Sequence, residues 1–145
     1  MKTVAEIVAL HGGLDALAAK PIKVLNEPYT PLNIEVIGHT QMEKRPVVAV
    51  SHSYVQNGDV MFDPEITFAV GADDSWSPRS FRQDGLGINQ EVERTDESGL
   101  VVRNERMARD LAAFARTWDR NLREQGFLDA YRTSRRATGN QETQR

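Results

Sequence analysis

The chain has 145 residues, a formal net charge of −3 at pH 7, 39% hydrophobic residues and 27% charged residues. These values are typical of one globular domain. The sequence contains no cysteine, which excludes a disulfide scaffold, a thiolate zinc site and a cysteine nucleophile. It has no apolar run near the roughly 20 residues of a membrane-spanning helix and no secretory signal at its start. We therefore expect a cytoplasmic protein that does not bind membranes.

The N-terminal segment predicts two short helices. Thr3 and Glu6 have the spacing of a capping box, with the hydroxyl first and the carboxylate three residues later. Apolar residues then recur at helical intervals, but Gly12-Gly13 interrupts the pattern because glycine disfavours a helix interior. We expect helices over residues 3–11 and 14–19, followed by a proline-rich linker of extended character.

The middle of the chain predicts about five strands connected as hairpins. Alternating apolar and polar residues indicate strands over 32–36, 46–56 and 60–70, and a second hairpin over 79–94. Asn57-Gly58, between the two longest strands, is typical of a two-residue type I′ turn. Short connections of this kind favour antiparallel pairing.

The C-terminal part predicts one long helix. Asn104 can cap it, a single apolar stripe follows from Met107 to Leu122, and Gly126 is placed to end it. The expected fold is α+β, with a curved antiparallel sheet packed against this helix and a short N-terminal helix. We expect a single domain over residues 1–131 and a disordered basic tail over residues 132–145.

The Asn57-Gly58 turn also predicts a polar face. A two-residue loop makes His52 face Asp63, with Tyr54 and Glu65 on the same side and within reach. The opposite face, which carries mostly apolar residues, is then assigned to the core. A bulge near Pro64 would reverse part of this register. The candidate polar cluster comprises His52, Tyr54, Gln56, Asp59, Asp63 and Glu65.

Three kinds of site could use this cluster. A His–Asp pair can orient a general base, and His52, Asp63 and Glu65 could form a two-carboxylate, one-imidazole metal site. The third is a surface that recognises a partner or a ligand. The alternative to all three is a solvated sheet face with one favourable ion pair. No nucleophile in a recognisable setting and no close ligand spacing accompanies the cluster. The sequence therefore indicates no cofactor and favours a role without catalysis.

Charge is distributed unevenly along the chain. Residues 1–100 contain 8 Lys and Arg against 15 Asp and Glu, whereas residues 101–145 contain 10 Arg against 6 Asp and Glu. Guanidinium groups bind carboxylates and phosphates through paired hydrogen bonds. The arginines either form a solvated helix face or contact a partner. Candidate partner contacts are Trp76, Arg116, Arg120 and Arg123.

Two motifs in the hairpin region resemble those of an uncharacterised domain. The motifs are H-x-Y-x-Q-N-G-D-x-M-x-D-P-E-x-x-F from His52 to Phe68 and F-x-Q-D-x-x-G from Phe81 to Gly87. This domain occurs in short proteins encoded on bacterial plasmids and integrative elements, and it has no established activity. The resemblance covers roughly residues 32–95, with Arg82 in place of an expected glutamine. It implies a bacterial host and a setting of mobile DNA, where small acidic proteins often act by binding, for instance by blocking a host nuclease.

We therefore expect a non-enzymatic binding or accessory protein of bacterial mobile DNA that acts through a protein partner. Nucleic acid is a second partner class, although a sequence pI near 5.6 opposes nonspecific affinity for phosphates. The alternatives are a metal-dependent or acid–base enzyme that uses His52, Asp63 and Glu65, and a sensor that binds a small ligand between sheet and helix. Exposed strand edges also favour a homodimer.

Overall fold

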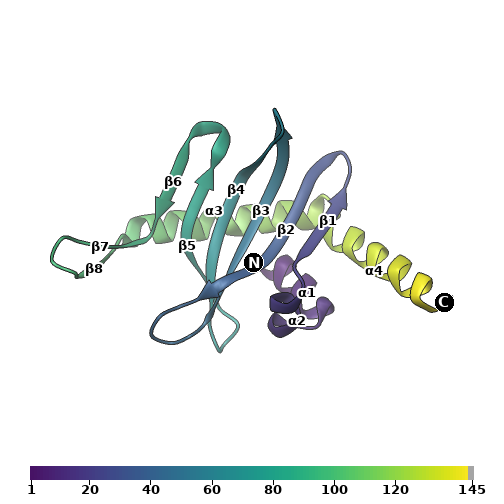
Figure 1. The fold of residues 1–145 in the computed structure, drawn as a ribbon, viewed down its shortest axis with the longest axis horizontal. Helices are drawn as coiled ribbons and strands as arrows, with labels where there is room; N and C mark the ends of the chain where they lie inside the picture. The colour runs from purple at the N-terminus through teal and green to yellow at the C-terminus, as the bar shows by residue number, and fades with distance from the viewer. Residues whose placement is uncertain (144–145) are drawn as a thin grey trace.

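Six antiparallel strands form one sheet in which each strand lies beside the next one in the sequence (Figure 1). The computed structural model describes residues 1–143, and it describes side chains for residues 1–137. The strands are β1 (Ile22–Asn26), β2 (Tyr29–His39), β3 (Pro46–Gln56), β4 (Asp59–Val70), β5 (Trp76–Gln83) and β6 (Ile88–Glu91). A short 3-10 helix, η1 (Asp84–Leu86), connects β5 to β6, and β7 (Glu93–Thr95) pairs with β8 (Val101–Arg103) in a projecting hairpin.

Helices cover one face of the sheet and leave the other face open (Figure 1). They are α1 (Lys2–His11), α2 (Leu14–Ala19), α3 (Glu105–Glu124) and α4 (Phe127–Thr143). Helix α3 crosses behind the strands, and α4 continues past the edge formed by β1. No helix within residues 1–143 is long and apolar enough to cross a membrane. The α+β prediction is confirmed, with one strand more in the main sheet than expected.

The two N-terminal helices and the long helix α3 form where the sequence predicts them. Asn104 caps α3, because its side-chain oxygen accepts a hydrogen bond from the backbone N–H of Met107 at 3.0 Å. Gly126 follows α3 with φ of 87°, a left-handed conformation that favours glycine. The predicted disordered tail starts at residue 132; the structure describes residues 132–143 as part of α4, and residues 144–145 of that predicted tail lie outside the described part of the chain. Arg132, Arg135, Arg136 and Ala137 in this segment are residue types that favour helix.

Helix α1 is capped differently from the prediction. Thr3 lies inside the helix, and the carboxylate of Asp119 in α3 accepts hydrogen bonds from the backbone N–H of Thr3 at 3.0 and 3.1 Å and of Val4 at 3.3 Å. Arg123 then pairs with Glu6 at 2.6 Å. The predicted capping box between Thr3 and Glu6 is wrong because a carboxylate distant in sequence satisfies the first N–H groups of the helix.

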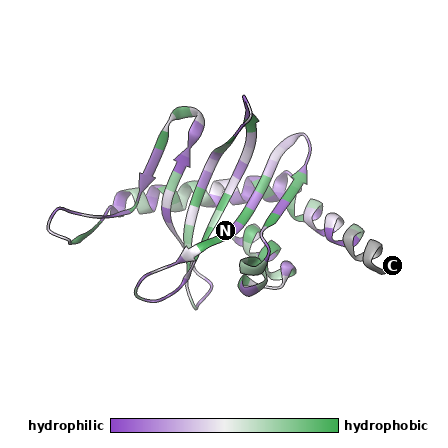
Figure 2. Ribbon diagram, viewed as in Figure 1, coloured by the Kyte–Doolittle hydropathy of each residue, from purple (hydrophilic) through white to green (hydrophobic). Residues whose placement is uncertain are grey.

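The core lies between the sheet and the helices. Hydrophobic and hydrophilic residues alternate along the strands (Figure 2), and Val50 of β3 and Ile66 of β4 are fully buried on the helix side. The predicted core face holds for Ile66 of β4, but Val50 rather than Ala49 is its neighbour on β3. The prediction is wrong near the turn, where Val55 is 72% exposed and Val60 is 57% exposed. Residues 47–50 are apolar at every position, so alternation could not distinguish the two faces of β3.

Candidate functional site

The Asn57-Gly58 turn forms as predicted, but its register holds only near the turn. Asn57 and Gly58 have φ of 53° and 86°, and Ser53 faces Phe62 as expected. The next pair is Ser51 with Glu65, so β4 advances three residues where β3 advances two. The extra residue is a bulge at Asp63-Pro64, where proline cannot donate a ladder hydrogen bond.

This bulge separates the predicted His52–Asp63 pair. The ring of His52 points to the helix side, with centroids 5.5 Å from those of Trp118 and Phe127. Its Nδ1 lies 3.2 Å from the carbonyl oxygen of Thr30 and 3.3 Å from that of Pro31, so Nδ1 carries the hydrogen. Burial lowers the pKa of His52, and the two carbonyl contacts oppose this shift. The imidazole is therefore a neutral packing group at the edge of the core.

The other members of the predicted cluster lie in separate places. A Cβ built on Gly85 would lie 3.2 Å from the Tyr54 hydroxyl and 3.3 Å from an Asp63 carboxylate oxygen. Tyr54 and Asp63 thus meet beside η1. Gln56 and Asp59 pair at the turn and are both exposed. The structure therefore brings together only parts of the expected cluster.

Glu65 lies on the open face within a different set of charges. Burial raises its pKa; Arg82 opposes this shift, while Glu35 and Asp84 add to it. Across the sheet, Glu65 is aligned with Ser51 on one side and with Arg82 on the other. Sequence reasoning missed this row because it depends on the bulge, which aligns Glu65 with Ser51 rather than with Val50, the neighbour that an unbroken hairpin register predicts.

Arg82 is held by local contacts that sequence reasoning also missed. Its Nε and Nη2 donate hydrogen bonds to Asp84 at 2.5 and 3.1 Å. Asp84 also accepts the backbone N–H of Phe62 at 2.8 Å, and the guanidinium lies 5.1 Å from the centre of the Phe62 ring. The hydrogen bonds from Arg82 and Phe62 lower the pKa of Asp84. Arg82 and Asp84 are hydrogen-bonded to each other, so this pair fixes the corner between β5 and η1 rather than offering unpaired charges to a ligand.

A metal centre is not formed by these residues. Across the part of the chain that the structure describes, no three His, Cys, Asp or Glu side chains are grouped closely enough to hold a metal ion. The alternative of a metal site made of His52, Asp63 and Glu65 is therefore wrong, because the imidazole faces the helices and the Glu65 carboxylate faces the open side.

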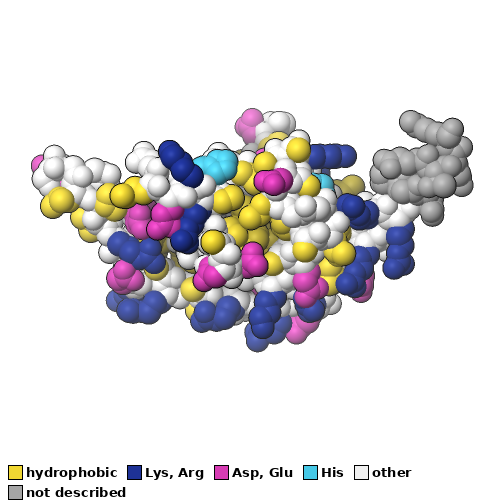
Figure 3. Space-filling model, turned by 90° about the horizontal axis from the view of Figure 1, so that it is seen from below, with side chains coloured by type: hydrophobic (Ala, Val, Ile, Leu, Met, Phe, Trp, Pro, Cys, Tyr) yellow, Lys and Arg dark blue, Asp and Glu magenta, His cyan; other side chains and the backbone are white. Residues whose placement is uncertain are grey.

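The outer face of α3 carries a free arginine stripe, which we define as Arg106, Arg109, Arg116 and Arg120. All four side chains are exposed. At 3.6 residues per turn they fall within an arc of about 80°, opposite the buried side of the helix, over a length of roughly 21 Å. None forms a hydrogen bond or ion pair with a residue that the structure describes. In the view from below (Figure 3), Lys and Arg side chains gather along the rim that α3 forms, with some Asp and Glu among them.

The predicted partner contacts divide into two groups. Arg116 and Arg120 belong to the free stripe. Arg123 instead donates hydrogen bonds to Glu6 at 2.6 Å and to the Thr3 hydroxyl at 3.0 Å. Trp76 is half-buried and packs edge-on against Phe68, with ring centroids 5.6 Å apart. Arg123 and Trp76 therefore have structural contacts that account for their positions.

A family model described as "Domain of unknown function (DUF6908)" matches residues 2–128. The chain belongs to this family. The prediction that the chain contains a domain of unknown function is thus confirmed, and the match covers residues 2–128, which include α1, α2 and α3. No curated protein and no solved structure matches the chain.

Proposed function

We propose that this DUF6908 protein is a non-enzymatic accessory protein of bacterial mobile DNA that docks an acidic protein surface on the arginine stripe of α3. The observation that carries the proposal is the stripe itself: four exposed guanidinium groups on one helix face without partners among the described residues. Arginine pairs with carboxylates bidentately, and it is enriched at protein interfaces. The setting of mobile DNA rests on the resemblance of the hairpin motifs.

The charge of the chain favours a protein partner over nucleic acid. The net charge is −3, and affinity for a polyphosphate depends on the number of phosphates that cations neutralise. Carboxylates also flank the stripe on the same helix, at the exposed residues Glu105, Asp110 and Glu124. A partner that presents a limited acidic patch can match the stripe and avoid these carboxylates, whereas a long nucleic acid backbone passes close to them.

The stripe has a convenient probe position at its centre. Ala113 is exposed on α3 between Arg109 and Arg116, so a photo-crosslinking amino acid there reports what covers the helix. We expect one crosslinked acidic protein in bacteria that carry the mobile element. After purification, that protein should bind the wild-type chain, and combining Arg109→Glu, Arg116→Glu and Arg120→Glu should weaken the binding at least tenfold, as expected when several charged contacts are reversed.

A matched control keeps the change in net charge and moves its location. Lys2, Lys44 and Arg94 are exposed and lie outside α3, and their combined replacement by Glu should leave binding within about twofold, because surface charges away from an interface act only through screened long-range fields. The proposal fails if the stripe variant binds the partner as well as the control does. It also fails if the stripe instead binds duplex DNA with a salt slope near the roughly −3.6 expected for four phosphate contacts.

A further inference from the structure

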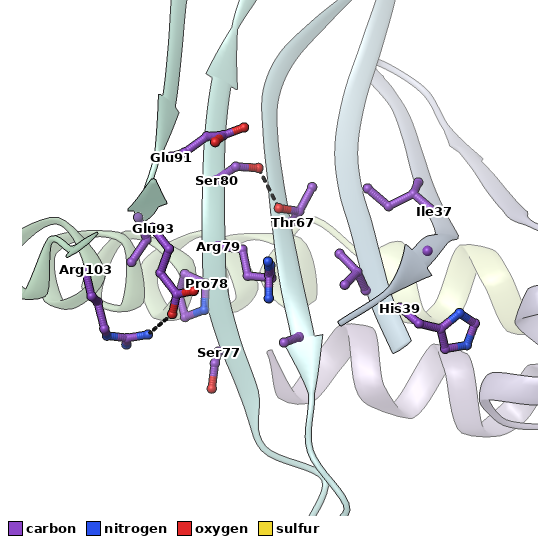
Figure 4. Close-up of a pocket in the computed structure, with 14 residues that line it drawn as sticks. Ile37, His39, Thr67, Ser77, Pro78, Arg79, Ser80, Glu91, Glu93 and Arg103 are labelled. Carbon is purple, nitrogen blue, oxygen red and sulfur yellow. Dashed lines mark hydrogen bonds and ion pairs between the residues drawn. The ribbon is translucent and has the colours of Figure 1, made fainter. Parts of the chain in front are cut away.

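A cavity of about 380 Å³ opens on the uncovered face of the sheet, near the ends of β2 and β4 (Figure 4). This volume is in the range of small-molecule sites. The cavity lies on the opposite side of the sheet from α3, so it is separate from the arginine stripe. It also differs from the predicted ligand site, which would lie between the sheet and the helix.

Arg79 is the cationic residue of this cavity whose side chain has no ion pair with a described residue. The register between β4 and β5 shifts after Thr67, which pairs with Ser80, whereas Phe68 pairs with Pro78. Arg79 is thus the extra residue of a bulge, a feature that re-aims side chains. Its side chain reaches from β5 over β4 (Figure 4). The guanidinium is half-buried and forms no hydrogen bond or ion pair with any residue in the described part of the chain.

Two hydroxyl groups lie beside Arg79. The side chains of Thr67 and Ser80 are hydrogen-bonded at 2.5 Å. Two hydroxyls carry two hydrogens, and the bond between them uses only one. The second hydrogen can be donated to an oxygen atom in the cavity. A guanidinium and an adjacent hydroxyl donor form a binding set for a carboxylate.

The cavity also presents a negative charge. Glu91 reaches from β6 towards the same side as Arg79, with the Ser80–Thr67 pair between them (Figure 4). It is exposed and has no partner among the described residues. The second pair of opposite charges at the rim is already closed, because Arg103 bonds to Glu93 at 3.2 Å. A simple anion would meet repulsion from Glu91, whereas a zwitterion matches both free charges.

The third wall is apolar. Ile37, Val47 and Ala69 line the side that lies across the strands from β6. Ile37 is 53% exposed, so a ligand that covers it removes apolar surface from water. From these features we propose that the cavity binds an aliphatic α-amino acid. Its carboxylate meets Arg79 and the hydroxyl pair, its ammonium group meets Glu91, and its side chain covers Ile37 and Val47.

The test uses calorimetric titration of the full chain with three probes: leucine, 4-methylpentanoate, which lacks the ammonium group, and glycine, which lacks the side chain. Leucine should bind saturably, and each of the other two at least tenfold more weakly. Arg79→Gln should weaken leucine binding at least tenfold. Glu91→Gln should weaken leucine binding and leave 4-methylpentanoate binding unchanged or tighter.

Arg94→Gln is the matched control, because Arg94 is an exposed arginine outside the cavity, and it should bind leucine like the wild type. Circular dichroism confirms that each variant is folded. The inference is overturned if leucine shows no saturable binding at millimolar concentration, if 4-methylpentanoate binds as tightly as leucine, or if Arg79→Gln binds leucine normally. None of these results affects the docking surface on α3.

Discussion

Replacing Asp119 with alanine tests how the N-terminal helices are attached to the sheet. The Asp119 side chain is 8% exposed, and its carboxylate accepts the backbone N–H groups of Thr3 and Val4. These N–H groups belong to the first turn of α1, which has no partners for them within the helix. The negative charge also lies at the positive end of the helix dipole.

The expected cost follows from these contacts. A hydrogen bond to a charged group contributes about 1.5–3 kcal/mol, and a buried donor left without a partner costs a similar amount. Two backbone donors share one carboxylate, so we expect Asp119→Ala to reduce the free energy of unfolding by about 3 kcal/mol. For a chain of this size each kcal/mol lowers Tm by roughly 3 °C, which gives a decrease of roughly 9 °C.

Thermal and urea unfolding followed by circular dichroism measure this change. Hydrogen exchange of the Thr3 and Val4 amides provides a local reading, because their protection should fall more than that of core amides. Asp110→Asn is the control: Asp110 is an exposed carboxylate of the same helix without a described partner, and its replacement should change stability by less than about 0.5 kcal/mol. An unchanged Tm in Asp119→Ala, or equal losses in both variants, would refute the reasoning.

Three other substitutions test the site and the helix end. Burial lowers the pKa of His52, so the unfolded chain binds a proton at this imidazole more readily than the folded chain does, and stability is lost as pH falls below about 6.5. In His52→Phe, the free energy of unfolding in urea should therefore decline less between about pH 7 and pH 5 than in the wild type. An identical decline in the two proteins would contradict this. Burial raises the pKa of Glu65, which means that the charged carboxylate destabilises the folded chain at neutral pH. Glu65→Gln should therefore be more stable than the wild type at neutral pH in the same assay, and the difference should vanish below about pH 4. A less stable variant at neutral pH would show that the carboxylate is net favourable. A Cβ at Gly126 meets no atom within 4 Å, so Gly126→Ala should cause no steric clash. It should lower the free energy of unfolding by about 1–2 kcal/mol, the strain of a left-handed conformation in a residue with a Cβ, as measured by thermal unfolding. A neutral effect would mean that the helix end rearranges.

The parts of the fold that the sequence predicts well are those with local signals. The cap at Asn104, the glycine after α3 and the Asn57-Gly58 turn each depend on residues within a few positions of one another. The same is true of the register next to the turn, where Gln56 faces Asp59. Local hydrogen bonds and backbone preferences determine these features, so no knowledge of distant contacts is needed.

The features that the sequence did not predict depend on distant contacts. The prolines around β1 predict a linker, but Ile22 and Val24 alternate with exposed residues and are buried against the helices. The candidate site changed for the same kind of reason. Pro64 predicts a bulge as an alternative to the unbroken hairpin register. Only the packing of His52 against Trp118, however, decides which face of β3 meets the helices.

Strand β4 shows how one sheet can serve two surfaces of different chemistry. Ile66 and Phe68 point to the helices and are buried beneath α3, whereas Thr67 and Ala69 point the other way and line the open-face cavity. The arginine stripe on the outside of α3 is therefore separated from the cavity by a full layer of core side chains. Since close-packed cores tolerate little deformation, the proposed ligand in the cavity and the proposed partner on α3 would not compete for the same side chains. Each proposal depends on arginines whose side chains have no hydrogen bond or ion pair within the described chain.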